Sequence, residues 1–170
     1  TVKGSNTSFY SMRDYIANTN PYLPNYFDEC HKRLDLFNFT DYMAGENWFG
    51  NADWIYNNMK MARTRTFDNK WRFFLQDLEW GLGGWTNYTS NMFDWFENQS
   101  QGTPFWDIYN GLIQNPKFKN YFINRYADLM NTTFQADHYQ GIIDSMYSEL
   151  LVDYPRSLLL WTGNSNMGNY

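Results

Sequence analysis

Aromatic side chains are the feature of this sequence that most limits how it can fold. Phe, Tyr and Trp make up 21% of its 170 residues, whereas its total hydrophobic content, 43%, is ordinary. A chain of this length can bury a core without disulfides and fits one compact domain, which we place at residues 1–170. We therefore predict a core built from Phe, Tyr and Trp more than from Leu and Val, with many polar ring tips inside it.

Charge and cysteine content narrow the classes of partner. The net charge is −5, the pI is about 4.9, and no run of Lys and Arg stands out. Nucleic-acid binding needs a clustered basic surface, so we expect no nucleic-acid partner. Cys30 is the single cysteine, which excludes an internal disulfide and favours a small buried thiol. No stretch has the apolar length of a transmembrane segment, and the start at Thr1 without methionine leads us to expect a segment of a longer protein.

The first half of the chain is predicted to hold two helices and a β-hairpin. Apolar residues recur at helical spacing over 8–18, until two prolines end the pattern. A second helix is predicted at 35–49, with Asp35 as its N-cap. Two segments rich in β-forming residues then flank a polar turn, which predicts antiparallel strands at 59–65 and 70–76 with a tip at 67–69.

The second half is predicted to be helical after a long loop. We interpret residues 81–101 as that loop, which in a compact domain is more often functional than idle. Thr103-Pro104 and Asn115-Pro116 each place a capping residue before a proline, and this pattern predicts two helix starts. A last helix is predicted at about 137–151. The fold class that follows is α+β, mostly α-helical, with one central β-hairpin.

The hairpin would bring distant oxygen ligands together. If its strands pair about a centre near residues 67 and 68, facing residue numbers sum to roughly 135, which sets Asn58 opposite Asp77. Asp53 lies in the turn "GNADWIYNN" at residues 50–58 and can fold over the same place. Two carboxylates and an amide are oxygen ligands suited to Mg²⁺, which takes one or two carboxylates plus waters and substrate phosphates.

The spacing of these residues matches that of a phosphotransfer site. Protein kinases carry a catalytic Asp, an Asn five residues later that binds a metal, and a second metal-binding Asp that follows a hairpin. Asp53, Asn58 and Asp77 have this order and spacing. The same residue types also suit turns and caps, so a purely structural role stays open at this point.

Longer motifs resemble one known family. The segments "LDLFNFTDYMAGENWFGNADWIYNNMKMAR", "KWRFFLQDLEWGLGG" and "NPKFKNYFINRYADLMN" follow one another in the chain. They are similar in order and in motif to the CotH kinase family, named after a bacterial spore-coat protein, over most of residues 34–135. Members of this family resemble protein kinases in fold, and the characterised ones transfer phosphate from ATP to protein substrates.

The resemblance implies a role for each matching residue. Asp53 would be the catalytic aspartate, Asp77 a metal ligand, and Asn58 a second metal ligand whose assignment rests on its spacing as much as on the motif. Glu79 stands where the family usually has Asp, and its predicted role is in cofactor binding, through a second metal ion or the phosphates. The implied cofactors are ATP and Mg²⁺, the implied partner is a protein substrate, and the implied location is extracytoplasmic, on a bacterial surface or spore coat.

One part of a kinase has no counterpart in the sequence. A glycine-rich phosphate loop followed by a strand lysine is missing, because "GLGG" at 81–84 lies after the metal aspartate and not before it. We therefore expect this chain to be equivalent to the carboxyl-terminal lobe of a kinase, with the nucleotide-clamping lobe outside it. By itself, such a chain is expected to transfer little or no phosphate.

Two other readings compete with a kinase. Exposed tryptophans could stack on sugar rings, which would make the protein a surface binding or adhesion module, for example one that binds carbohydrate. Asp94 and Glu97 could be paired carboxylates of a glycosidase, although a solvated loop explains them more simply. The tryptophans that could stack on sugars are Trp48, Trp54, Trp80, Trp85, Trp95 and Trp106.

Three cations lie on or beside the predicted hairpin. Lys60, Arg63 and Arg72 could contact phosphate or could be ordinary exposed hairpin cations.

Overall fold

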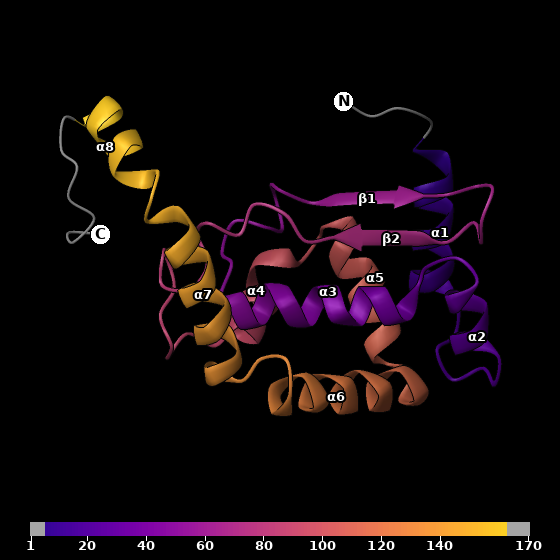
Figure 1. Ribbon diagram of the computed structural model, residues 1–170. Helices are drawn as coiled ribbons and strands as arrows, with labels where there is room; N and C mark the ends of the chain where they lie inside the picture. The colour runs from indigo at the N-terminus through magenta and orange to yellow at the C-terminus, as the bar shows by residue number, and fades with distance from the viewer. Residues whose placement is uncertain (1–5, 163–170) are drawn as a thin grey trace. The chain divides into compact units, whose positions relative to one another are not determined.

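The computed structural model describes residues 6–162 of the chain (Figure 1). It divides into two compact units, one ending at Asp128 and the other beginning at Leu129. The first contains α1 (Thr7–Asn18), α2 (Tyr26–His31), α3 (Leu36–Phe49), β1 (Lys60–Arg63), β2 (Trp71–Phe74), α4 (Met92–Ser100), α5 (Pro104–Ile113) and most of α6 (Pro116–Asn131). The second contains the end of α6, α7 (Ala136–Leu150) and α8 (Tyr154–Thr162). The prediction of a mostly helical α+β chain is confirmed.

Helix α3 is the centre of the first unit. The Asp35 side chain accepts a hydrogen bond from the Asn38 amide and caps the helix as predicted, and Gly50 ends it in a left-handed conformation with φ 65°. The hairpin lies along α3 (Figure 1), and β2 contacts it directly. Most of the helix is consequently buried: Leu36, Phe39, Thr40, Tyr42, Met43, Ala44, Gly45, Glu46 and Asn47.

The core of the first unit is aromatic, as predicted. Phe105 of α5 lies at its middle and makes ring contacts with five other aromatic side chains at centroid distances of 5.1–6.2 Å. Edge-to-face and stacked pairs of this kind stabilise a core beyond the area that they bury. The five partners come from α3, the loop after it, β2 and α4: Phe39, Tyr42, Trp54, Phe73 and Phe96.

The hairpin forms where predicted but is shorter. Residues 60–63 pair antiparallel with 71–74, and paired residue numbers sum to 134. The ladder ends there because Asn58 and Asp77, just beyond it, have positive φ angles of 54° and 59°. An extended strand cannot continue through a left-handed residue. The sum is close to the predicted value of roughly 135, but Asn58 and Asp77 lie outside the paired residues and do not face each other across the ladder.

Three helices were not predicted. Residues 81–101 are not one long loop, because 92–100 form α4, which begins at the Asn91 cap and buries Met92, Phe96 and Ser100 at four-residue intervals. Helix α2 is short and follows the prolines that end the α1 pattern, and α8 lies beyond the last predicted helix. The signal for α4 was hidden because Asn91 stands in a polar run in which several residues could serve as a cap.

Other predictions concern single residues and helix starts. Thr103 caps α5 by accepting a hydrogen bond from the Trp106 amide (3.1 Å), and Asn115 accepts from the Phe118 amide (2.9 Å) at the start of α6. Both predicted starts are therefore confirmed. Cys30 is a buried free thiol, and burial raises its pKa to about 12. Within residues 6–162, no helix combines the length and the apolar character that crossing a lipid bilayer requires.

All the secondary-structure elements described in the second unit are helices. Helix α7 matches the helix predicted at about 137–151, and none of its residues is buried. The side that the sequence marks as apolar is 37–60% exposed at four positions, Ile142, Ile143, Met146 and Leu150.

Candidate functional site

The loop that carries Asp53 is fixed at both ends by buried residues. Gly50 turns the chain away from α3, and the side chain of the next residue, Asn51, is fully buried. Asn51 Oδ1 accepts a hydrogen bond from the Asp53 backbone N–H at 3.0 Å. Immediately after Asp53, the fully buried Trp54 ring stacks on Phe96 of α4 at a centroid distance of 5.4 Å. Asp53 itself is partly exposed, so it lies at the surface between the buried residues Asn51 and Trp54.

Two asparagine amides hold the Asp53 carboxylate. Asn57 Nδ2 donates to Oδ1 at 3.0 Å, and Asn58 Nδ2 donates to Oδ2 at 3.1 Å. One amide hydrogen bond to each oxygen fixes the orientation of the carboxylate. Because Asn58 uses its amide nitrogen here, its carbonyl oxygen is the atom that it can offer to a cation. The structure thus brings the predicted pair Asp53 and Asn58 together by direct contact.

The segment after β2 is anchored to the same end of α3. The Leu82 backbone N–H donates to the Phe49 carbonyl, and the Thr86 hydroxyl donates to the Gly50 carbonyl, both at 2.6 Å. A Cβ atom at Gly81 would lie 2.7 Å from the Phe49 carbonyl oxygen, so this close approach requires glycine. The end of α3 therefore joins the loop of Asp53 to the segment that carries Asp77 and Glu79.

Two other carboxylates at this place act on the carboxyl group of Glu79. Asp77 and Glu79 share a hydrogen bond, which raises the pKa of Glu79, and the negative charges of Asp77 and Asp53 raise that pKa further. Both Asp77 and Glu79 are exposed. Glu79, predicted from the family resemblance, is thus beside Asp77.

The oxygen atoms of this group fit a hard divalent cation. Asp77 and Glu79 supply a pair of adjacent carboxylates, and Mg²⁺ typically takes one or two of these and completes its shell with water and phosphate. Residues 6–162 contain no cluster of three or more His, Cys, Asp or Glu side chains arranged to enclose a metal ion. Asp53 therefore adds to the negative potential at Asp77 and Glu79. A cation held by these two residues would need substrate phosphates and water to complete its coordination shell.

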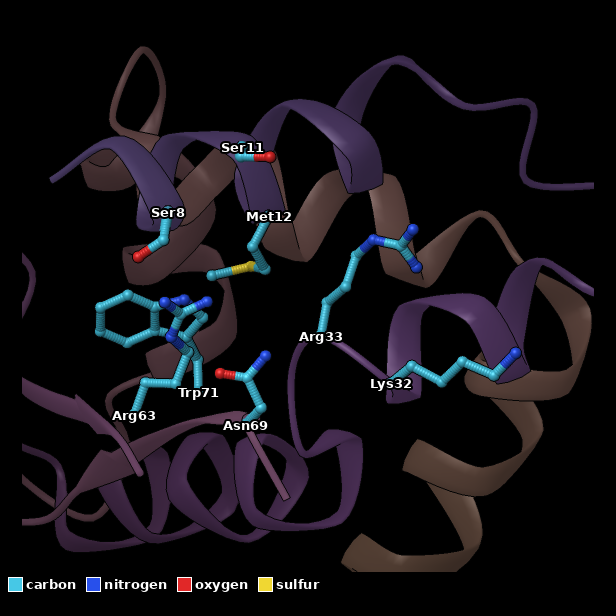
Figure 2. Close-up of a pocket in the computed structure, with 8 residues that line it drawn as sticks. All are labelled: Ser8, Ser11, Met12, Lys32, Arg33, Arg63, Asn69 and Trp71. Atoms are coloured by element: carbon cyan, nitrogen blue, oxygen red, sulfur yellow. The ribbon is translucent and has the colours of Figure 1, made fainter. Parts of the chain in front are cut away.

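A small hollow lies at the other end of the hairpin. Its volume is about 130 Å³, and Arg63, Asn69 and Trp71 line it together with residues of α1. Figure 2 shows that the charged groups of Lys32 and Arg33 extend away from the other side chains of the hollow. Asp53, Asn58, Asp77 and Glu79 do not line it, so these four residues lie outside this cavity.

Several other candidates have structural roles. Arg72 forms an ion pair with Asp35 at 2.9 Å and a second with Asp68, and the latter lowers the pKa of Asp68 to about 2. This arginine joins the hairpin to the start of α3. Asp94 accepts a hydrogen bond from Asn91 Nδ2 at 2.7 Å in the first turn of α4, so Asp94 and Glu97 belong to a helix and not to the predicted loop.

The tryptophans divide into two groups. Trp54 is fully buried, and Trp48, Trp95 and Trp106 are partly buried. Trp80 and Trp85 are exposed by 39% and 69%, and their rings meet edge to face at a centroid distance of 4.9 Å. Most of the six are thus held in the fold, while this one pair stands at the surface.

Sequence reasoning missed Glu46, which holds Asn51. Asn51 Nδ2 donates to Glu46 Oε2 at 2.9 Å, and both side chains are fully buried. A signal was present, because Glu46 follows Tyr42 by four residues and Phe39 by seven and so falls on the apolar stripe of α3. A charged residue at such a position is rarely buried without a specific partner.

Comparison with known proteins gives one result. The model of the family described as CotH kinase protein matches residues 2–169, which is nearly the whole chain. No curated protein and no solved structure gave a match. The family match covers the α3 end, the Asp53 loop, the hairpin and the Asp77 segment described above. The chain therefore belongs to the CotH kinase family.

Proposed function

We propose that this chain is part of a kinase that transfers the γ-phosphoryl group of ATP to a hydroxyl group of a protein substrate in the presence of Mg²⁺. Membership of the CotH kinase family supports a kinase-like function. The arrangement of Asp53, Asn58, Asp77 and Glu79 supports the finer assignment. We also propose the extracytoplasmic location, on a bacterial surface or spore coat, that the family resemblance implies.

The adjacent carboxylates of Asp77 and Glu79 carry the proposal. Two exposed acids close enough to share a hydrogen bond, with the pKa of Glu79 raised by Asp77 and then by Asp53, repel each other when both are ionised. A divalent cation would remove this repulsion and favour the doubly ionised form. Asp77 and Glu79 would hold the metal, and the Asn58 carbonyl oxygen would be a further ligand. Bound Mg²⁺ would neutralise charge on the transferring phosphate.

Asp53 is proposed to orient the acceptor hydroxyl. Its two oxygens each accept one amide hydrogen bond, from Asn57 and Asn58, and each keeps a second lone pair. The acceptor O–H can donate to one of these and lose its proton there as the phosphoryl group transfers. Asn58 would then serve both residues, with its amide nitrogen on Asp53 and its oxygen toward the metal, which couples the acceptor position to the phosphate position.

We place these residues in a part equivalent to the carboxyl-terminal lobe of a kinase. Among residues 6–162 there is no glycine-rich turn followed by a strand lysine, the usual clamp for nucleotide phosphates. The clamp is therefore assigned to residues outside this range. The 170-residue chain alone should transfer little phosphate, and substantial ATP turnover by it would contradict this assignment.

Nucleotide binding by the full-length parent protein tests the function. ATP should bind in the presence of Mg²⁺ and not after chelation, and Asp77→Ala should abolish the metal-dependent part. Asp144→Ala, which removes an exposed carboxylate from α7 in the second unit, is the matched control and should bind normally. Equal ATP binding with and without Mg²⁺, or normal binding by Asp77→Ala, would reject the proposed metal site.

The exposed Trp80 and Trp85 pair favours a second candidate, a non-catalytic surface binding or adhesion module. Aromatic rings at a surface can stack on sugar rings, and this pair is joined edge to face at 4.9 Å. A panel of oligosaccharides tested against the parent protein and Trp85→Ala would separate the two functions. Sugar binding that is lost in Trp85→Ala, together with no Mg²⁺-dependent ATP binding, would favour the binding module.

A further inference from the structure

A buried chain of hydrogen bonds connects α3 to the proposed catalytic aspartate. Glu46 Oε2 accepts from Asn51 Nδ2 at 2.9 Å, and Asn51 Oδ1 accepts from the Asp53 backbone N–H at 3.0 Å. The Asn51 backbone N–H also donates to the Glu46 carbonyl at 3.1 Å. Glu46 and Asn51 are both 0% exposed, so water does not compete for these bonds.

The bond to Glu46 determines which way the Asn51 amide faces. A carboxyl oxygen without a proton can only accept, so it selects the Nδ2 side of the amide, and Oδ1 must then face Asp53. If Glu46 were apolar, the amide could rotate by half a turn and place its NH₂ group against the Asp53 N–H. The Asp53 backbone N–H would lose its acceptor, and the loop would lose the hydrogen bond that fixes the Asp53 backbone.

Core stability alone does not explain a glutamate at this position. Moving a carboxylate from water into the core costs free energy, and a protein with an apolar side chain of similar volume at that position is often as stable or more stable. The other oxygen, Glu46 Oε1, is buried without a hydrogen-bond partner in the described structure, as is the nearby Tyr42 hydroxyl. Burial also raises the pKa of Glu46 to about 7. A residue that weakens the core in this way is expected to serve another purpose.

We propose that Glu46 and Asn51 are positioning residues for phosphotransfer, which hold the Asp53 backbone so that its carboxylate meets the acceptor hydroxyl. This inference rests on the proposed function. Neither side chain reaches solvent, so neither would touch ATP or the acceptor. Their effect should be on the geometry of the chemical step, where a displacement of about 1 Å can reduce the rate about 100-fold.

The first measurement does not depend on activity. In the full-length protein without nucleotide, hydrogen exchange at the Asp53 amide should be slow in the wild type and faster in Asn51→Ala and Glu46→Leu. Glu46→Gln should retain protection, because its amide oxygen can still accept from Asn51. Asn51→Ser should be intermediate, because a serine hydroxyl can bond to the backbone two residues on, but more weakly. Protection unchanged in both Asn51→Ala and Glu46→Leu would overturn the inference.

The second measurement concerns the reaction. Asn51→Ala and Glu46→Leu should lower kcat by about 10- to 100-fold with little change in the KM for ATP, and Glu46→Gln should restore most of the rate. Asn115→Ala is the matched control, since Asn115 is also a buried asparagine that accepts a backbone N–H bond, at the start of α6. It should reduce stability without this loss of kcat.

The outcomes separate this inference from the proposed function. A wild-type parent that transfers no phosphate would reject the function, and with it the kinetic role, while amide protection would still decide whether Glu46 and Asn51 hold the loop. Transfer by the wild type, together with an unchanged kcat in a folded Asn51→Ala or Asn51→Ser protein, would overturn the positioning role alone. Near-ultraviolet circular dichroism establishes that each variant is folded.

Discussion

Glu46→Gln should make the stability of this chain less dependent on pH. Burial raises the pKa of Glu46 from the ordinary 4.5 to about 7, although the hydrogen bond from Asn51 opposes the shift. A difference of this size corresponds to about 3 kcal/mol at 1.36 kcal/mol per pKa unit. Since Glu46 is fully buried, little of this effect is screened by solvent.

The sign follows from where the proton is held. Below pH 4.5 the folded and unfolded chains both hold the proton, and the carboxyl group carries no penalty. Between pH 4.5 and about 7 the unfolded chain releases it while the folded chain keeps it, so the free energy of unfolding falls as pH rises. Above about pH 7 the folded chain must bury an ionised carboxylate, and the loss is complete.

Urea unfolding of the 170-residue chain measures this effect. Glutamine keeps an oxygen for Asn51 and has no proton to lose, so Glu46→Gln should be close to the wild type at pH 5 and more stable by up to about 3 kcal/mol at pH 8. Glu97→Gln, an exposed glutamate of α4, should change stability by less than about 0.5 kcal/mol at both pH values. A Glu46→Gln difference that is the same at pH 5 and pH 8 would refute the reasoning.

Three further substitutions test the proposed site and the fold that supports it. Gly81→Ala would place a Cβ atom 2.7 Å from the Phe49 carbonyl oxygen and should weaken Mg²⁺-dependent ATP binding by the parent protein. Gly141→Ala in α7 is the control, because a Cβ atom there would have no other atom within 4 Å. It should bind ATP normally and raise the free energy of unfolding by up to about 1 kcal/mol. Thr103→Ala removes the cap of α5 and should cost about 1 kcal/mol by urea unfolding, so an unchanged midpoint would contradict the capping role. Asp77→Gly should leave thermal stability unchanged or raise it, because glycine suits the left-handed backbone, yet abolish Mg²⁺-dependent ATP binding; normal binding would show that Asp77 is only a turn residue.

Helix starts were predictable because their signals are local. Asp35 and Thr103 each bond to a backbone N–H only three residues away, so the sequence alone contains both partners. The same is true of Asn91, but the neighbouring polar residues obscured it, and α4 was read as a loop. The predicted strand ends were wrong for a different reason. The left-handed conformations of Asn58 and Asp77 shorten the strands, and the composition of a strand-forming segment does not reveal such conformations.

The sequence predicts a set of site residues but not the contacts among them. Spacing and family motifs placed Asp53, Asn58, Asp77 and Glu79 near one another, but the contacts run within two pairs and not across the hairpin. Asn58 bonds to Asp53, and Glu79 interacts with Asp77. The apolar stripe of α3 places Glu46 on the buried side, but its partner Asn51 could not be predicted from α3, because Asn51 folds back from the following loop in a tertiary contact.

The structural and chemical explanations of Asn58 and Asp77 are compatible. Both residues have left-handed backbones, and Asn and Asp tolerate this conformation better than most residues, so each is a reasonable turn residue. Glycine would satisfy the same backbone with less strain. The backbone therefore accounts for why the strands end there, but it does not account for a side chain. Since the Asn58 side chain binds the Asp53 carboxylate and that of Asp77 interacts with Glu79, the residue types are explained by what these side chains hold, and the turns place them at the open end of the hairpin.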